Sequence, residues 1–299
     1  MTAAPPCPAL PFYLGCPVWN CAGWVGEVFP PRTPRDKWLS WYTQTFNTVE
    51  GNSTFYALPS IESTQRWARQ SADGFQFCFK FPREISHDCE LENAEGLTET
   101  FLRVLQPLAD ANRLGPTFLQ LGPAFGPRKF GALQRYLEGL PKHWKWAVEL
   151  RHLDWFDQGD NEGRVNDLLS SLAIDKVLFD SRPLYQSPPD DDIEAKSQER
   201  KPKTPVRQTV TGKSPMLRIV GRNRVELTDS FFRQWAPIVA KWIRDGMIPY
   251  VFTHAPDDAN APALARRFLS ILQQELPEYV LTIPRPPMPM QQLTLLDDI

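Results

Sequence analysis

The 299-residue sequence lacks any apolar run of the roughly 18 residues that a membrane-spanning helix needs. Its first twelve residues, MTAAPPCPALPF, also lack the basic segment and the apolar stretch of a secretory signal peptide. We therefore expect neither a membrane partner nor export, and we predict a cytoplasmic location.

Cysteine, histidine and net charge are also low. Five cysteines, an odd number, are scattered through the chain, which argues against a disulfide scaffold and fits the cytoplasm. Cys16 and Cys21 form a C-x4-C pair without a second pair or a nearby histidine, so we expect no zinc site there. With a net charge of −2, the chain as a whole does not attract polyanions, and any nucleic-acid surface must be a local patch.

Short apolar runs alternate with amphipathic segments along the whole chain. The runs predict eight strands, at residues 12–19, 48–54, 75–81, 117–122, 145–151, 176–181, 216–221 and 248–255. Between them, apolar residues recur at the three- and four-residue spacing of helices. Strands that alternate with helices indicate right-handed βαβ units and a parallel sheet.

Eight such units predict a closed (β/α)8 barrel of the TIM type, which needs on the order of 250 residues. A doubly wound open sheet would have a glycine-rich phosphate turn after its first strand, and GCPVWNCAGWVG does not match G-x-G-x-x-G. We predict an N-terminal arm at 1–11, one barrel domain at 12–281 and a proline-rich tail at 282–299. Within the barrel, an irregular, charged and proline-rich lid loop at 182–215 replaces the helix after strand six.

Alternation within the strands predicts which side chains enter the barrel. In FQFCFKF, residues 75–81, the phenylalanines share one face, which should meet the helices, while Gln76, Cys78 and Lys80 share the other. The same reasoning directs a set of polar side chains inward near the C-terminal strand ends, where barrel active sites are built: Glu50, Asn52, Lys80, Gln120, Glu149, Arg151, Asp180, Arg218 and His254.

Two interpretations of this polar set stay open. The three cations Lys80, Arg151 and Arg218 balance three carboxylates, so the set is able to form buried ion pairs that only maintain the register of the barrel. Desolvation offsets most of the Coulomb gain of such pairs, however, and the polar groups gather at one end. We therefore favour a ligand-binding or catalytic pocket.

The pocket interpretation assigns a candidate role to each residue. Proton transfer is assigned to Glu50, Glu149, Asp180 and His254, with a structural histidine as the alternative for His254. Substrate binding is assigned to Trp19, Asn52, Tyr56, Lys80, Arg83, His87, Gln120, Arg151, His152, Trp155 and Arg218. No cofactor is predicted, although one divalent ion held by the four proton-transfer candidates is conceivable.

Six segments together resemble the YecE-like family: GCPVWNCAGWVGEVFP, FNTVEGNSTFYALPS, FCFKFPREISHD, LGPTFLQLGPAF, WAVELRHLDWF and FDSRP. The resemblance spans about residues 12–275 and implies a barrel of the triosephosphate-isomerase type, without a particular reaction. The shared blocks correspond to Trp19, Trp24, Gly26, Glu50, Asn52, Ser53, Phe55, Tyr56, Lys80, Pro82, Arg83, His87, Gln120, Glu149, Arg151, Trp155 and Asp180.

This chain departs from the family pattern in strands seven and eight. Many members carry Arg-x-His-Gly in strand seven, where this sequence has Arg218-Ile219-Val220-Gly221 without a histidine. Strand eight ends in THAPDD, residues 253–258, in place of an asparagine-rich turn. If those positions take part in the chemistry of the family, this protein performs that chemistry differently, or His254 substitutes in space for the missing histidine.

Two segments suggest partners. The basic half of the lid loop, 196–213, is able to grip phosphate or a nucleic acid, or is simply a solvated surface. The tail contains Gln292, Leu293, Leu295 and Leu296, which are similar to the Gln-Leu-x-Leu-Phe peptides that dock on the bacterial sliding clamp. A frayed terminus is the alternative for the tail.

Two function hypotheses result. The first is an enzyme that performs acid–base or hydrolytic chemistry on a small anionic substrate, such as a phosphorylated sugar or a nucleotide. The second is a binding protein associated with nucleic acid or replication, which uses residues 196–213 and the clamp-like tail.

Overall fold

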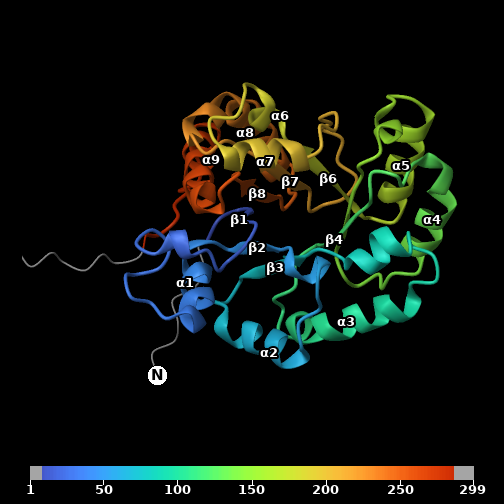
Figure 1. Cartoon of the computed structure of the whole chain (residues 1–299), viewed down its shortest axis with the longest axis horizontal. Coiled ribbons are helices and arrows are strands. Elements are labelled where there is room, and N and C mark those ends of the chain that lie inside the picture. The colour runs from blue at the N-terminus through green and yellow to red at the C-terminus, as the bar shows by residue number, and fades with distance from the viewer. Residues whose placement is uncertain (1–8, 286–299) are drawn as a thin grey trace, which may run out of the picture.

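The computed structural model describes residues 9–285, which fold into eight parallel strands surrounded by helices (Figure 1). The strands are β1 (Tyr13–Cys16), β2 (Thr48–Gly51), β3 (Gln76–Phe79), β4 (Thr117–Gln120), β5 (Trp146–Glu149), β6 (Asp175–Asp180), β7 (Met216–Val220) and β8 (Tyr250–His254). All eight lie within the segments that were predicted as strands, apart from the first residue of β6.

The strands form the expected TIM-like barrel. They are arranged in the order β3-β2-β1-β8-β7-β6-β5-β4, so the first and last strands of the chain are neighbours. The remaining gap between β3 and β4 is crossed by isolated bridges, including Lys80 opposite Phe118. Backbone hydrogen bonds from Gly115 to Phe77 (2.8 Å) and from Phe81 to Phe118 (3.0 Å) join the same two segments. The predicted fold class is thus confirmed.

Helices follow the strands in turn and cover the outside of the barrel. They are α1 (Trp38–Thr45), α2 (Ile61–Gln70), α3 (Glu95–Asp110), α4 (Phe130–Glu138), α5 (Asp160–Ser171), α6 (Arg182–Tyr185), α7 (Asp192–Arg200), α8 (Asp229–Arg244) and α9 (Ala261–Glu275). Shorter 3-10 turns are η1 (Ala22–Trp24), η2 (Arg35–Lys37), η3 (Ser53–Phe55), η5 (Pro127–Lys129), η6 (Leu153–Phe156), η7 (Val225–Thr228) and η8 (Asp258–Asn260), and η4 (Glu84–Asp88) is a π-helical turn.

The apolar core has two layers, because alternate residues of each strand face opposite sides. The outer layer lies between strands and helices and includes Phe77 and Phe79, as the alternation predicted. The inner layer fills the barrel itself and comprises Cys78, Phe118, Ala147, Val177, Met216, Tyr250 and Phe252. This inner layer closes the lower part of the barrel, so the interior is open toward the C-terminal ends of the strands.

The segment at 182–215 differs from the expectation of an irregular loop. It contains two short helices, α6 and α7, and Figure 1 shows α7 lying across the face of the barrel near β7 and β8. Asp191 caps α7, because its side chain accepts a hydrogen bond from the backbone N–H of Glu194 (2.7 Å).

Other expectations fall partly beyond the described residues. Most of the predicted N-terminal arm and most of the tail, including the four clamp-like residues at 292–296, lie outside 9–285. Within that range, no helix is both long and apolar enough to cross a membrane.

Candidate functional site

The C-terminal ends of the strands open into a cavity of about 670 Å³. Strand ends, the turns that follow them and α7 all contribute to its wall. The lining residues are Pro17, Val18, Asn52, Phe55, Tyr56, Lys80, Gln120, Arg151, Ile193, Lys196, Ser197, Arg200, Lys201, Pro202, Arg218, His254, Ala255, Pro256 and Asp258. Alternation along the strands predicts six of these as inward-facing, namely Asn52, Lys80, Gln120, Arg151, Arg218 and His254.

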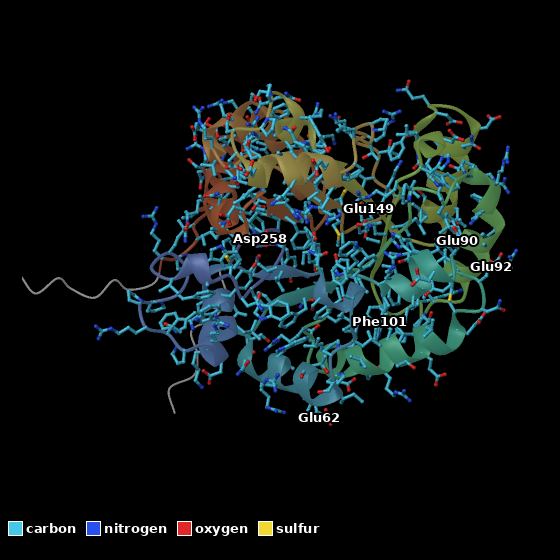
Figure 2. The ribbon with its side chains drawn as sticks, viewed as in Figure 1. Glu62, Glu90, Glu92, Phe101, Glu149 and Asp258 are labelled. Carbon is cyan, nitrogen blue, oxygen red and sulfur yellow. The ribbon has the colours of Figure 1, made fainter. Side chains whose placement is uncertain are left out.

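Arg218 forms the centre of the cavity floor. Its guanidinium donates two hydrogen bonds of 2.7 Å to the carboxylate of Glu50 and a further one to Glu149, and all three side chains are buried. In Figure 2, Glu149 lies among the strands toward the middle of the molecule, whereas Glu62 lies at its edge. A fully buried arginine is thus held between carboxylates from β2 and β5, on two different sides of the barrel.

Two further side chains extend this floor. Arg151 donates to Glu149 and, through Nη2, to the amide oxygen of Gln120 (2.9 Å). On the other side, Asn52 donates to Oε1 of Glu50 (2.7 Å). The floor is therefore a continuous network from β2 to β4, in which each buried carboxylate accepts from at least two side chains.

Electrostatics keep both buried glutamates ionised. Burial alone would raise the pKa of Glu50, but Arg218 and then His254 hold that pKa well below its usual range. For Glu149, burial is likewise outweighed by Arg151 and Arg218, so its pKa is also lowered. As ionised partners of arginines, these two carboxylates are weak proton acceptors at neutral pH.

His254 is the histidine of this network. It is 3% exposed, and its Nε2 lies 3.2 Å from Oε2 of Glu50. Burial lowers the pKa of the imidazole despite the opposing effect of Glu50. Because the glutamate is ionised and accepts, Nε2 carries the proton and Nδ1 of the neutral ring is left as an acceptor.

Two lysines and an aspartate at the cavity also have shifted pKa values. Burial, followed by the nearby charge of Arg218, lowers the pKa of Lys80 to about 7. The same two causes lower the pKa of Lys201. Asp258 faces the same cavity, and burial raises the pKa of its carboxyl group although Lys201 opposes the shift.

Helix α7 closes one side of the cavity and is fastened to the end of β7. Glu194 is buried on the inner face of α7 and pairs with Arg222 at 2.6 Å, while Asp190 approaches the same guanidinium at 3.1 Å. The other carboxylate oxygen of Glu194 accepts from the backbone N–H of Asn223 (2.8 Å). This attachment holds Lys196, Arg200 and Lys201 at the mouth of the barrel.

Comparison with known families places the chain. A family model described as "Protein of unknown function DUF72" matches residues 13–292. The chain belongs to the DUF72 family. The YecE protein of Escherichia coli K12, described as a UPF0759 protein, is 37% identical over 266 residues, which cover 89% of this chain and 94% of that protein. The UPF0759 protein YunF of Bacillus subtilis 168 is 26% identical over 149 residues, or 48% of this chain and 52% of YunF.

Solved structures of DUF72 proteins have the same fold. One from Enterococcus faecalis V583 superposes with a TM-score of 0.66 at 18% identity, covering 88% of this chain and 97% of its own. One from Thermotoga maritima MSB8 gives 0.65 at 22% identity, covering 90% and 99%. At such identities these structures show the fold alone, which is the barrel. The family match and the 37% identity to YecE bear out the resemblance found in the sequence.

Asp180 does not take the place in the DUF72 pocket that was predicted for it. On β6 it is Phe179 that faces inward, where its ring lies 4.6 Å from the guanidinium carbon of Arg151. Asp180 faces outward, accepting from the indole N–H of Trp235 (2.8 Å) and from Arg182. The four residues proposed to hold a divalent ion therefore do not converge.

Within residues 9–285, no three His, Cys, Asp or Glu side chains are grouped so that they could hold a metal ion. Glu50 and Glu149 already accept from arginines and from Asn52. The cavity thus presents an arginine–carboxylate network rather than a set of free oxygen ligands.

Three aromatic or imidazole side chains predicted to bind substrate lie elsewhere. Trp155 is fully buried and donates to the carbonyl of Phe125 (2.7 Å), so it offers no face to a ligand. Trp19 packs edge-on against Trp67 and lines a small cavity of about 70 Å³ next to Glu50 and Asn52, outside the main cavity. His152 accepts from the N–H of Asp154 (3.2 Å) and caps its own turn.

Three other predicted binding residues lie along one rim. Tyr56 lines the main cavity and is 83% exposed. Arg83 lines an adjoining cavity of about 240 Å³ and pairs with Asp88 at 3.3 Å. His87 packs edge-on against Phe55, and burial followed by Lys80 lowers its pKa. Tyr56 is thus at the main site, whereas Arg83 and His87 lie beside it.

The basic segment 196–213 does not form one surface. Lys196, Arg200 and Lys201 face the cavity, but Arg207 pairs with Glu162 at 3.0 Å on the α5 side. Lys213 precedes β7 and therefore lies toward the opposite end of the barrel. Three of its cations, rather than the whole segment, are available at the mouth.

The sequence analysis does not single out two charged residues of the site. Lys201 falls within the basic segment 196–213, which is predicted as a whole to bind phosphate, and Asp258 appears only as the end of THAPDD. Both follow C-terminal strand ends, β6 through α7 and β8 directly, which is the signal that identifies active-site positions in a barrel.

Proposed function

We propose that this DUF72 chain is an enzyme that binds a small anionic substrate, such as a phosphorylated sugar or a nucleotide, and performs acid–base chemistry on it. The observation that carries the proposal is the charge of the cavity. Six cationic side chains line it, against one lining carboxylate, Asp258. Even with Glu50 and Glu149 included, positive charge is in excess, which favours an anionic guest.

The size and position of the cavity support the same proposal. About 670 Å³ is within the range of roughly 300–1,000 Å³ that small-molecule sites occupy. Arginines that are already held by carboxylates, as Arg218 and Arg151 are, have fixed donors and lose little side-chain entropy when a phosphate or carboxylate binds.

Proton transfer is assigned to His254. Its neutral ring is oriented by Glu50, so Nδ1 is unprotonated. The ring also lines the cavity. A neutral imidazole is the side chain best matched to accept and return a proton near pH 7. Glu50 acts as the group that orients it, rather than as the base itself.

A ligand screen tests the proposal. Thermal shifts with ribose 5-phosphate and with nucleoside monophosphates should exceed those with ribose or nucleosides, and Lys201→Met should reduce them. Lys213→Met is the matched control, because it removes an equal charge from an exposed lysine before β7. Equal shifts with charged and uncharged compounds would contradict anion recognition.

The chemistry is tested on any hit by proton NMR in D2O. Acid–base catalysis at a carbon should introduce deuterium into the ligand, and His254→Asn should slow this exchange by about 10² to 10⁴-fold while ligand affinity changes little. Exchange at the wild-type rate in His254→Asn would remove the histidine from the mechanism.

Binding of nucleic acid at Lys196, Arg200 and Lys201 is an alternative proposal, and docking of the tail on a sliding clamp stays a prediction. Fluorescence anisotropy with single-stranded DNA distinguishes the first from small-anion binding. A salt-dependent affinity for DNA that is lost when Lys196, Arg200 and Lys201 are all replaced by Met would favour nucleic-acid binding.

A further inference from the structure

Lys80 occupies an unusual position in the cavity. It follows β3 directly, is 8% exposed and lines the 670 Å³ cavity. Its Nζ lies 3.6 Å from the ring centroid of Phe55. Among the described residues, no hydrogen bond or ion pair reaches this Nζ, although the cavity wall contains several polar groups.

A second buried lysine shows how different this arrangement is. Lys176, on β6, is 1% exposed and turned outward, where its Nζ lies 3.5 Å from Glu162 and 3.0 Å from the amide oxygen of Asn166. That is the usual solution for a buried ammonium group, which costs much free energy to bury without partners. Lys80 is buried to a similar degree and lacks those partners.

The charges around Lys80 oppose its ammonium form and outweigh the aromatic ring beside its Nζ, which favours that form. Arg218 and Arg151 repel it, and the glutamates that would compensate, Glu149 and Glu50, are already bound to those arginines. Burial and these cations lower the pKa of Lys80 to about 7, so the neutral amine is accessible at neutral pH. A neutral amine in an apolar, cationic setting is a nucleophile.

We propose that Lys80 is a covalent catalytic residue that forms an imine with the substrate, which is therefore an aldehyde or ketone bearing a phosphate or carboxylate group. The inference rests on the proposed function, because the same cavity must hold the anionic group. It adds the reactive part of the substrate, a carbonyl carbon within reach of Nζ.

The step is balanced without a further reagent. The amine lone pair forms a bond to the carbonyl carbon, the C=O π pair moves to oxygen, and one proton passes from nitrogen to that oxygen. The hydroxyl group takes up a second proton and leaves as water; this proton comes from solvent, and Nδ1 of His254, which lines the same cavity, is placed to accept it and pass it on. The product is a protonated C=N bond, which withdraws electrons and acidifies the adjacent C–H for acid–base chemistry.

Reductive trapping tests the inference on the full chain. The probe is pyridoxal 5′-phosphate, an aldehyde with a phosphate group, followed by borohydride and peptide mass mapping. We expect modification at Lys80, loss of it with inorganic phosphate, and a rate that rises with pH through about 7. Pyridoxal, which lacks the phosphate, should react at least about tenfold more slowly.

Variants of Lys80 separate the effect of its nucleophilic amine from the effect of its charge. Lys80→Arg keeps a cation but has no nucleophilic amine, and it should bind inorganic phosphate while losing the label. Lys80→Met repeats the test without the charge, and a thermal melt of each variant verifies that it is folded. Lys213→Met is the control, because it removes an exposed lysine outside the cavity, and it should retain the label at Lys80.

Each outcome of the trapping experiment either supports or overturns the assignment of Lys80. Label at Lys201 or Lys196 with Lys80 unmodified overturns the inference, as does label that persists in Lys80→Arg. Phosphate binding without any trapped imine overturns the inference and leaves the proposed function standing. Absence of both phosphate binding and trapping overturns the two together.

Discussion

At the scale of single residues, the cavity floor depends on charges that are paired before any ligand arrives. Arg218 satisfies Glu50 and Glu149 at once. Desolvation offsets much of the Coulomb attraction in such buried pairs, so they contribute little net stability and are strongly destabilising only when one member is removed. Their consequence is positional, because the arginine donors and His254 are fixed relative to the cavity.

Asp175 is a buried carboxylate outside this network. It begins β6, is 4% exposed and accepts from the backbone N–H of Ser214 (3.0 Å). Burial raises its pKa from 3.8 to about 6, and the Ser214 bond only partly opposes this. The folded state thus holds the proton to a higher pH than the unfolded state does.

The sign of the pH dependence follows. Stability contributed by protonated Asp175 is fully present below about pH 4 and is lost as pH rises through 6, a difference of about 3 kcal/mol. Asp175→Asn keeps an acceptor for Ser214 without a charge. We expect it to be more stable than the wild type by about 2–3 kcal/mol at pH 7.5 and nearly equal at pH 4, measured by urea unfolding.

Asp167→Asn provides the matched control, because Asp167 is exposed on α5. Its effect on unfolding free energy should be small and the same at both pH values. If Asp175→Asn is destabilising to an equal extent at pH 4 and pH 7.5, the buried carboxylate is not the source of the pH dependence.

At the scale of elements, alternation predicted most inward positions but failed on β6. Glu50, Lys80, Glu149, Arg218 and His254 do face the cavity or its floor. In DKVLFD, however, apolar residues occupy both faces of a strand that is buried on both sides, so polarity does not identify the inner face. The inner face contains Phe179, and only tertiary packing against Arg151 reveals this.

Helix α7 could have been predicted from its own sequence. Asp191 and Glu194 stand at the spacing of an N-terminal cap, and no proline occurs between 190 and 201. The composition of the whole segment obscured this local signal. What the sequence could not reveal is the partner of Glu194, because Arg222 is brought to it only by the return of the chain along β7.

The attachment of α7 yields a second prediction. Glu194→Ala leaves Arg222 without its closest carboxylate, and the loss of one partner of a buried pair costs on the order of 3 kcal/mol. We expect tryptic cleavage after Lys196 and Arg200 to rise at least about tenfold, measured by mass-mapped limited proteolysis of the folded protein.

Glu199→Ala is the control on the same helix, because Glu199 is exposed and its replacement removes the same charge. It should leave the cleavage rate near that of the wild type. Equal protection of α7 in both variants would show that packing, rather than the Glu194–Arg222 pair, holds the helix over the cavity.

At the scale of the whole molecule, overall charge and local charge have opposite signs. The chain carries −2 in total, yet the mouth of the barrel gathers six cations. At physiological ionic strength, salt screens electrostatic interactions beyond a Debye length of about 8 Å, so an anion near the mouth responds to the local charge. The barrel topology produces this separation, because it brings strand ends that are distant in sequence to one opening.

Charge-reversal variants distinguish the effect of local charge at the mouth of the barrel from the effect of the net charge of the chain. Arg200→Glu and Arg69→Glu change the net charge equally, but Arg200 lines the cavity and Arg69 is exposed in the last turn of α2, toward the opposite end of the barrel. We expect Arg200→Glu to weaken pyrophosphate binding about tenfold at low salt, and less at 0.5 M added salt (roughly the regime of a 4 Å Debye length). Isothermal titration calorimetry measures the binding at both salt concentrations.

Arg69→Glu should bind like the wild type, because Arg69 is exposed to solvent at the opposite end of the barrel and does not line the cavity. If the two variants weaken binding equally, the net charge of the chain governs the interaction, and the cavity is not where the anion binds.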